Sequence, residues 1–361
     1  MTLDSRALEE LDYTAAGVDI ERQDEALSLI KPLCELTHDQ YVCSGIGPFA
    51  PVIDEYGYCK DNYAYPLSLY STDGPGTIPQ IAKMAYGSIP ESFRALGYNV
   101  AVHCFSDIAC GCRSPFIFMD SLASTDLDPE IYRQIVGGMV DACLESNCRL
   151  IGGEMAQLPG TIMPGQYAFD GFVKGFVEEC DLIQPKKSIH PGQIVTGLLT
   201  DSIQLNGLSL YRKIVFDRLQ MQFDSLLPTG RTVATEVLRR QYNYSKAVMA
   251  QMGEGIPICA CSNITGGGLI DNVTRNLPEG CRVIYDTKSW QIPTLFTWLI
   301  EQGNVQLKKA FKTWAMGVGY VQIFDDLDIA LEAMEIAHDV IDCDTAVIGR
   351  VEAGATGVQF V

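Results

Sequence analysis

The chain has 361 residues, of which 47% are hydrophobic and 20% are charged. This composition excludes a disordered chain, and the length suits two domains or one domain used twice. The formal net charge of −19 argues against surfaces for nucleic acid or anionic membranes, because such surfaces need clustered Lys and Arg. We therefore expect a globular protein with neither nucleic acid nor a membrane as its partner.

The amino-terminal residues lack the apolar core of a signal peptide, and no run approaches the ~18 apolar residues of a membrane span. We therefore expect a cytoplasmic protein whose thirteen cysteines are reduced thiols. The pairs Cys110–Cys112 and Cys259–Cys261 have C-x-C spacing, which differs from the C-x₂-C spacing of common zinc sites. Zinc binding is the less favoured interpretation of these pairs.

Two short apolar runs in the first half of the chain predict strands. The run at 67–71 is followed by Asp73 in a glycine-containing loop, and the run at 115–119 ends at Asp120. In both places an acidic residue stands where the apolar run stops.

An amphipathic helix is predicted at 129–147. Asp128 can cap its first turn, Pro129 suits its first position, and apolar residues then recur at helical spacing. The helix lies between the strand that ends at Asp120 and a strand run that leads into Glu154, which predicts a strand–helix–strand unit with parallel neighbouring strands. Both carboxylates would then emerge on the same edge of the sheet.

The rest of the chain alternates further strands and helices. We predict strands at 166–177, 193–199, 317–324 and 345–351, and helices at 208–218, near Leu269 and at 327–340. A polar connector begins at residue 178, so we place a domain boundary there and expect domains 1–177 and 178–361. The mixture of strands and helices in both halves predicts an α+β fold.

A cation site is predicted from four acidic residues that each follow an apolar run: Asp73, Asp107, Asp120 and Glu154. Carboxylates at the ends of neighbouring strands converge on one rim of a sheet, where Mg²⁺ finds oxygen ligands together with nucleotide phosphates. Turn formation by Asp and Gly is the ordinary alternative at any single position. Recurrence at four positions favours a cradle for ATP and Mg²⁺.

Glycines near these acids support the same interpretation. Gly74 and Gly76 lie in the loop after the first acid, and Gly152 and Gly153 precede the last one. Glycine lets backbone N–H groups approach phosphates closely. A further glycine triplet at 266–268 precedes a predicted helix, whose N-terminus would suit an anion.

Several motifs along the chain resemble those of one known family. They are Tyr13–Ile20, Ser71–Thr77, Pro115–Asp120, Leu150–Gly160, Asn206–Leu210, Ile264–Gly268, Asn276–Pro278 and Met316–Gly319. In this order, and nearly from end to end, they resemble the AIR synthetase (phosphoribosylformylglycinamidine cyclo-ligase) family. That family belongs to an ATP-binding superfamily with selenophosphate synthetase and thiamine-monophosphate kinase.

The resemblance implies a two-domain fold and a chemistry. The amino-terminal sheet would pair with that of a second subunit to form a barrel in a homodimer, and a carboxy-terminal α/β domain would follow. ATP and Mg²⁺ would lie between the domains on Asp73, Asp107 and Glu154. Asp120 is a weaker candidate for a metal ligand, from the pattern of strand ends and not from the resemblance, because an aspartate there often caps the next turn. In such enzymes ATP phosphorylates an amide oxygen of a small-molecule substrate, and an internal nitrogen then closes a ring as phosphate leaves.

The same resemblance implies which residues contact the nucleotide: Gly74, Gly76, Thr77, Gly152, Gly153, Asn206, Thr265, Gly266 and Gly267. Several motif positions depart from the family pattern. Lysine is replaced by Ile78, asparagine by Ser106 and Ala315, histidine by Gln204 and Asn263, and glutamate by Gln157. The glycines that shape the backbone are retained, whereas cationic and proton-transferring side chains are lost.

These departures leave several functions open. Isoleucine cannot make the charge-assisted contact of a lysine, and Gln or Asn cannot transfer a proton as histidine does. We expect a paralogue that uses the same ATP chemistry on a different amide or carboxylate. The alternatives are an authentic AIR synthetase with compensating groups, a non-catalytic relative, and an unrelated two-domain binding protein without affinity for nucleotide.

Overall fold

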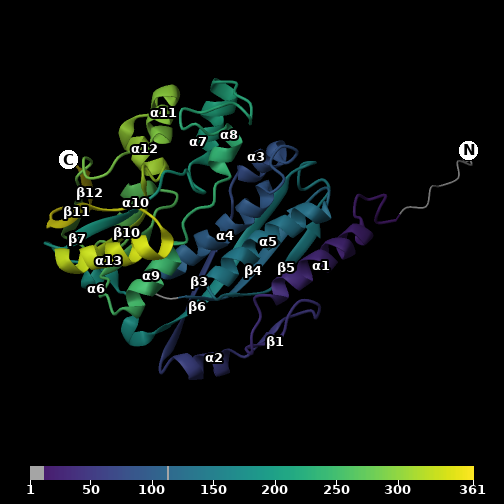
Figure 1. Ribbon diagram of the computed structural model, residues 1–361, viewed down its shortest axis with the longest axis horizontal. Helices are drawn as coiled ribbons and strands as arrows, with labels where there is room; N and C mark the ends of the chain where they lie inside the picture. The colour runs from purple at the N-terminus through teal and green to yellow at the C-terminus, as the bar shows by residue number, and fades with distance from the viewer. Residues whose placement is uncertain (1–11, 112–113) are drawn as a thin grey trace, which may run out of the picture.

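The computed structural model describes residues 12–111 and 114–361 as a two-domain α+β protein (Figure 1). The first sheet has the order β3 (Pro66–Asp73), β6 (Tyr167–Glu178), β4 (Pro115–Ser124), β5 (Arg149–Gln157). β4 and β5 are parallel, and the other two pairs are antiparallel. The predicted strand–helix–strand unit is therefore confirmed, with its two strands as direct neighbours.

Helices cover one face of this sheet: α1 (Ile20–Glu35), α3 (Ile78–Ala85), α4 (Ser92–Ala109) and α5 (Pro129–Glu145). The predicted cap of α5 is confirmed, because the Asp128 side chain accepts hydrogen bonds from Glu130 N and Ile131 N. α4 and α5 pack closely, since a Cβ on Gly97 would lie 1.9 Å from the carbonyl oxygen of Ile135. α4 is thereby held between α5, the sheet and the second domain.

The opposite face of the first sheet is only partly covered. α2 (Glu55–Asn62) and the hairpin of β1 (Val42–Ser44) and β2 (Val52–Ile53) pack over one end, where the Tyr58 and Phe116 rings stack 4.0 Å apart. The remaining part, called here the open face, includes the side chains of Tyr70, Thr72, Ser121, Glu154, Asp170 and Phe172.

The second sheet has the order β12 (Gly357–Phe360), β9 (Cys281–Tyr285), β11 (Thr345–Ala353), β7 (Ile194–Leu199), β10 (Val318–Phe324), β8 (Ala260–Asn263). All its pairs are antiparallel except β12 with β9, so this domain is α+β and not the α/β domain that we expected. The helices of this domain are α9 (Tyr244–Gly253), α10 (Gly268–Thr274), α11 (Thr294–Gly303), α12 (Leu307–Thr313) and α13 (Leu327–Ile341). α8 (Val233–Val237) and α7 (Leu208–Arg212), which continues as a π-helical turn over Lys213–Arg218, lie beside α11 in Figure 1.

The two domains meet along α4, which contacts α9 and β8. The Asn99 side chain donates to Arg239 O at 2.7 Å and accepts from Gln241 N at 2.9 Å. The Gln241 side chain returns a hydrogen bond to Asn99 O at 2.6 Å. These buried contacts fix the segment before α9 on the first domain. The last strand of the first sheet ends at Glu178, and the division after residue 177 stays our proposal.

Among the described residues, no helix is long and apolar enough to cross a membrane. The cysteines of this part of the chain are all free thiols. Cys112 lies outside the described residues, so the interpretation of Cys110 and Cys112 as zinc ligands is not tested.

Candidate active site

Asp73 is the last residue of β3 and is held by a histidine from the neighbouring helix. The buried His103 Nε2 on α4 lies 3.0 Å from Asp73 Oδ2. Burial acts to raise the pKa of Asp73, but the hydrogen bond and charge of His103 and the Gly74 N–H outweigh it and hold this pKa below its usual value. Asp73 is therefore an oriented carboxylate at the start of the glycine-containing loop.

That loop connects β3 to α3 and contains Gly74 and Gly76, two of the predicted nucleotide contacts. A Cβ on Gly74 would lie 2.1 Å from Asp170 Oδ1 and 3.1 Å from Phe169 O, so a larger residue there would displace the Asp170 side chain. Gly76 has a φ of +58°. Thr77 precedes α3, and its hydroxyl is buried without a hydrogen-bond partner among the described residues. A buried hydroxyl in that state is an unsatisfied donor at the N-terminus of the helix.

Asp107 lies in α4, not at the end of a strand, so this part of the prediction was wrong. It follows His103 by one helical turn, and Ser71 precedes Asp73 by two residues on β3. Ser71 Oγ donates to Asp107 Oδ2 at 2.9 Å. Asp107 Oδ1 accepts from Asn263 Nδ2, also at 2.9 Å, so this carboxylate joins β3 to the second domain. Two successive contacts between β3 and α4 thus place Asp73 and Asp107 on the same side of β3, about one helical turn apart along α4.

Asp120 lies in the middle of β4, not at the rim of the sheet. Gly171 on β6 is the partner of both Asp73 and Asp120, so these carboxylates are separated by two strand spacings, roughly 10 Å. The Phe118 ring and Cys104 Sγ fill the space beside Gly171. Burial raises the pKa of Asp120 to about 7, helped by the charge of Glu154 and opposed by a hydrogen bond from its own backbone.

Glu154 on β5 lies one register position beyond the level of Asp120, and its side chain points to the other side of the sheet. Asp120 pairs with Gly153, whereas Glu154 pairs with Ser121 on β4. Successive residues of a strand face opposite sides, so the two carboxylates do not share the edge that we predicted. Among the described residues, no three or more His, Cys, Asp or Glu side chains form a group that could hold a metal ion. The four acids of one chain therefore do not converge.

Two residues of this region were not predicted from the sequence. His103 holds Asp73, but it lies in an almost wholly buried helix and gave no polar pattern. Asp170 contacts the Gly74 position and, with Ser121 and Glu154, forms a row across β6, β4 and β5 on the open face. Its exposed position in the alternating strand 167–173 was the signal that could have identified it.

The predicted nucleotide contacts of the second domain lie in or beside one loop, which follows Asn263. Asn206 Nδ2 donates to Ile264 O at 3.2 Å. Asn272 closes the glycine loop by donating to Thr265 O and Gly268 O at 3.1 and 3.0 Å. The other predicted residues of this loop are Gly266, which has open space beside it, and Gly267, which has a φ of +106°. This loop follows β8 and faces α4 through the Asn263–Asp107 contact.

Five of the six positions that depart from the family pattern are buried in this chain, and the sixth, Gln157, is partly exposed. The exposed fractions are 0% for Ile78, 2% for Ser106, 5% for Gln204, 7% for Asn263 and 1% for Ala315. Their polar groups have internal partners, since Gln204 donates to the Tyr244 hydroxyl at 2.8 Å and Ser106 to Val102 O at 2.9 Å. Gln157 exchanges two hydrogen bonds with the backbone of Asp19, which caps α1. The side chains at these positions therefore pack and form hydrogen bonds within the protein.

Comparison with known proteins identifies related sequences over nearly the whole chain. The profile described as "AIR synthase related protein, N-terminal domain" matches residues 66–179, and that of the C-terminal domain matches residues 190–361. A phosphoribosylformylglycinamidine cyclo-ligase of Lachnospira eligens is 33% identical over 97% of this chain and 100% of its own length. One from Trichlorobacter lovleyi is 36% identical over 86% of each chain.

Solved structures share the fold at much lower identity. Thiamine-monophosphate kinase from Stenotrophomonas maltophilia has a TM-score of 0.65 and 14% identity, with 93% of this chain and 95% of that chain covered. Hydrogenase maturation protein HypE in complex with ATP has a TM-score of 0.60 and 13% identity, with 92% and 90% covered. At these identities the likeness concerns the fold alone.

Proposed function

Because the chain belongs to the AIR synthase-related family, we propose that it is an ATP-dependent enzyme that phosphorylates an amide or carboxyl oxygen and then forms a bond from nitrogen to that carbon as phosphate leaves. The observation that carries this proposal is the end of β3. There, Asp73 is fixed by His103, and the loop that follows ends at Thr77, whose hydroxyl has no hydrogen-bond partner within residues 12–111 and 114–361.

The carboxylates near the end of β3 are sufficient for a nucleotide bound together with one cation. Mg²⁺ in such sites takes one or two carboxylates and otherwise phosphate oxygens and water. Asp73 and Asp107 supply that number, so the separate positions of Asp120 and Glu154 do not exclude the proposal. ATP would supply the phosphoryl group that turns the oxygen into a leaving group. The chain would orient it through Asp73, the loop amides and the Thr77 hydroxyl.

The substrate that we propose differs from that of the named relatives. Positions where the family carries a lysine and two histidines hold Ile78, Gln204 and Asn263, and all three side chains are buried here. Asn263 of the second domain donates a hydrogen bond to Asp107. An amide at this position cannot transfer a proton, as a histidine could. This interior packing supports a paralogue acting on another amide or carboxylate.

The second candidate is the reaction named for the relatives, phosphoribosylformylglycinamidine cyclo-ligation. Identity of 33% over the full length of one such relative favours it. We nevertheless expect poor turnover of that substrate. Loss of even two polar contacts, at ~2–3 kcal/mol each in the transition state, lowers the rate by roughly 10³–10⁴-fold.

Two measurements test these proposals. ATP with Mg²⁺ should raise the melting temperature more than either alone, and the absence of any such shift would reject the nucleotide site and favour a non-catalytic binding protein. Purified protein should then be incubated with formylglycinamidine ribotide, ATP and Mg²⁺. Formation of aminoimidazole ribotide at ~1 s⁻¹ or faster, within the usual range of enzymes, would reject the paralogue and restore the second candidate.

A further inference from the structure

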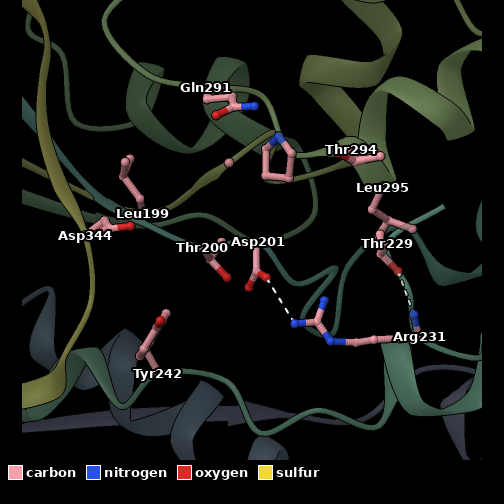
Figure 2. Close-up of a pocket in the computed structure, with 12 residues that line it drawn as sticks. Leu199, Thr200, Asp201, Thr229, Arg231, Tyr242, Gln291, Thr294, Leu295 and Asp344 are labelled. Atoms are coloured by element: carbon pink, nitrogen blue, oxygen red, sulfur yellow. Dashed lines mark hydrogen bonds and ion pairs between the residues drawn. The ribbon is translucent and has the colours of Figure 1, made fainter. Parts of the chain in front are cut away.

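A cavity of about 390 Å³ opens at the ends of the inner strands β7, β10 and β11 of the second sheet (Figure 2). Its wall includes Thr200 and Asp201 after β7, Asp344 before β11, and Gly317 before β10. This volume is that of a site for a small metabolite. None of the residues proposed above for the nucleotide lines it, so the cavity is separate from the phosphate loop.

The Arg231 side chain lines this cavity and makes two long ion pairs there. Its guanidinium nitrogens lie 3.6 Å from Asp201 Oδ2 and 3.6 Å from Glu236 Oε2, which are ion-pair distances beyond hydrogen-bond range. Within residues 12–111 and 114–361, the Arg231 side chain makes no hydrogen bond. Arg239 instead serves both acids, at 2.6 Å from Asp201 and 3.4 Å from Glu236. The planar donors of Arg231 therefore remain for a carboxylate brought by a ligand.

Asp344 supplies the opposite charge on the far side of the cavity. Figure 2 shows Asp344 and Tyr242 on the left of the cavity and Arg231 entering from the right. The backbone carbonyl of Asp344 accepts from Leu199 N at 2.7 Å, which fixes the position of the residue. Its exposed carboxylate has no hydrogen bond or ion pair in the part of the chain that the structure describes. It is therefore available to an ammonium or hydroxyl group.

The charges of the cavity discriminate between classes of ligand. Asp201, Asp344 and Arg231 line the cavity, and Glu236 and Arg239 form ion pairs with them from behind its wall. These three negative and two positive charges leave one net negative charge. A phosphate group would bring up to two more negative charges into this surrounding. A ligand whose carboxylate and ammonium group are separated by a short carbon chain brings no net charge and can reach both Arg231 and Asp344 across the cavity.

We propose that this cavity binds a small zwitterion of the amino acid class, with its carboxylate on Arg231 and its ammonium group on Asp344. Thr294 and Gln291 offer uncharged polar groups at the same cavity for the remainder of the ligand. The binding requires neither ATP nor Mg²⁺, so it is independent of the proposed reaction.

The test uses the full-length protein and, as separate probes, each of the protein L-amino acids and the longer zwitterions β-alanine, γ-aminobutyrate and δ-aminovalerate, in thermal-shift and ligand-observed NMR measurements without nucleotide. At least one amino acid should bind the unaltered protein. Arg231→Gln and Asp344→Asn should each weaken that binding by about ten- to one-hundred-fold, the range for a lost charged hydrogen bond. Analogues of the bound amino acid that lack either its amino or its carboxylate group should bind correspondingly weakly.

Two control variants keep the chemistry of the changes but lie outside the cavity. Asp342→Asn, two residues from Asp344, and Arg275→Gln, on an exposed position after α10, should leave the affinity unchanged. Asp344 is exposed, so its variant should fold even if the Arg231 variant does not. The proposal is overturned if no amino acid binds, if binding survives both cavity variants, or if ribose 5-phosphate binds through Arg231 in place of a zwitterion.

Discussion

Asp120 is a carboxyl group that burial keeps protonated to an unusually high pH. Its folded pKa of about 7 lies above the ordinary value of 3.8, with burial as the main cause. The contribution of Asp120 to stability is therefore fully present below about pH 4 and is lost as the pH rises to 7, because the unfolded chain ionises first.

Replacing Asp120 by Asn should remove this pH dependence. We expect Asp120→Asn to increase the free energy of unfolding by about 1–3 kcal/mol at pH 8 and by much less at pH 5. Urea unfolding at the two pH values, without nucleotide or Mg²⁺, measures the difference. Asp224→Asn, at an exposed position, is the matched control. An equal effect of Asp120→Asn at both pH values would contradict the assigned pKa.

Asp107 has two possible roles, as a cation ligand and as a link between the domains. We expect Asp107→Asn to weaken binding of Mg·ATP by on the order of 1–3 kcal/mol, because it removes a charged contact. Isothermal titration calorimetry measures this affinity. Asn263→Ser removes the amide that donates to Asp107 but retains the carboxylate. Unchanged affinity in Asp107→Asn, or an equal loss in both variants, would show that the carboxylate acts only between domains.

The loop from β3 to α3 allows folding and ligand binding to be separated. Thr77 precedes α3 without a side-chain cap, and its buried hydroxyl has no partner among the described residues. We therefore expect Thr77→Val to leave the unfolding free energy unchanged or to raise it by up to ~1 kcal/mol, since an unsatisfied polar group is removed. The affinity for Mg·ATP should fall in the same variant. Reduced stability with unchanged affinity would assign the hydroxyl to the fold alone.

At the level of elements, periodic segments were predicted well and the buried helix was not. α5 lies on one face of the sheet, so its apolar residues recur on one side of the helix. Asp128 and Pro129 mark the start of this helix. α4 is buried on nearly all sides, between α5, the sheet and the second domain. Such a helix has no polar face, and its apolar run before Asp107 was therefore interpreted as a strand end.

For the whole molecule, we predict a homodimer formed through the open face of the first sheet. β3 and β5 are the two edges of this sheet, and Tyr70 on the open face is 59% exposed. Unpaired edges and exposed aromatic residues favour pairing with a second copy. The Phe49 side chain lies beside the same face and is fully exposed.

Light scattering should give about twice the 39.6 kDa of one chain. Tyr70→Glu combined with Phe49→Glu should shift the mass to that of a monomer, because buried charges would oppose the interface. Leu307→Glu with Leu331→Glu, at exposed positions of the second domain, should retain the dimer. A monomer mass for the unaltered protein at all concentrations would reject the prediction.

The sequence by itself determined the family, the α+β class, most strands and helices, and the neighbourhood of Asp73 with its glycine loop. These features depend on local patterns such as turn residues, caps and periodicity, and on motifs that keep their order. Only the tertiary structure decided which acids meet. Register places Asp120 and Glu154 on opposite sides of the sheet, and packing of α4 brings His103 and Asn263 to Asp73 and Asp107. Side-chain direction in a strand reverses with each residue, and contacts between domains join distant parts of the chain, so neither follows from the order of residues alone.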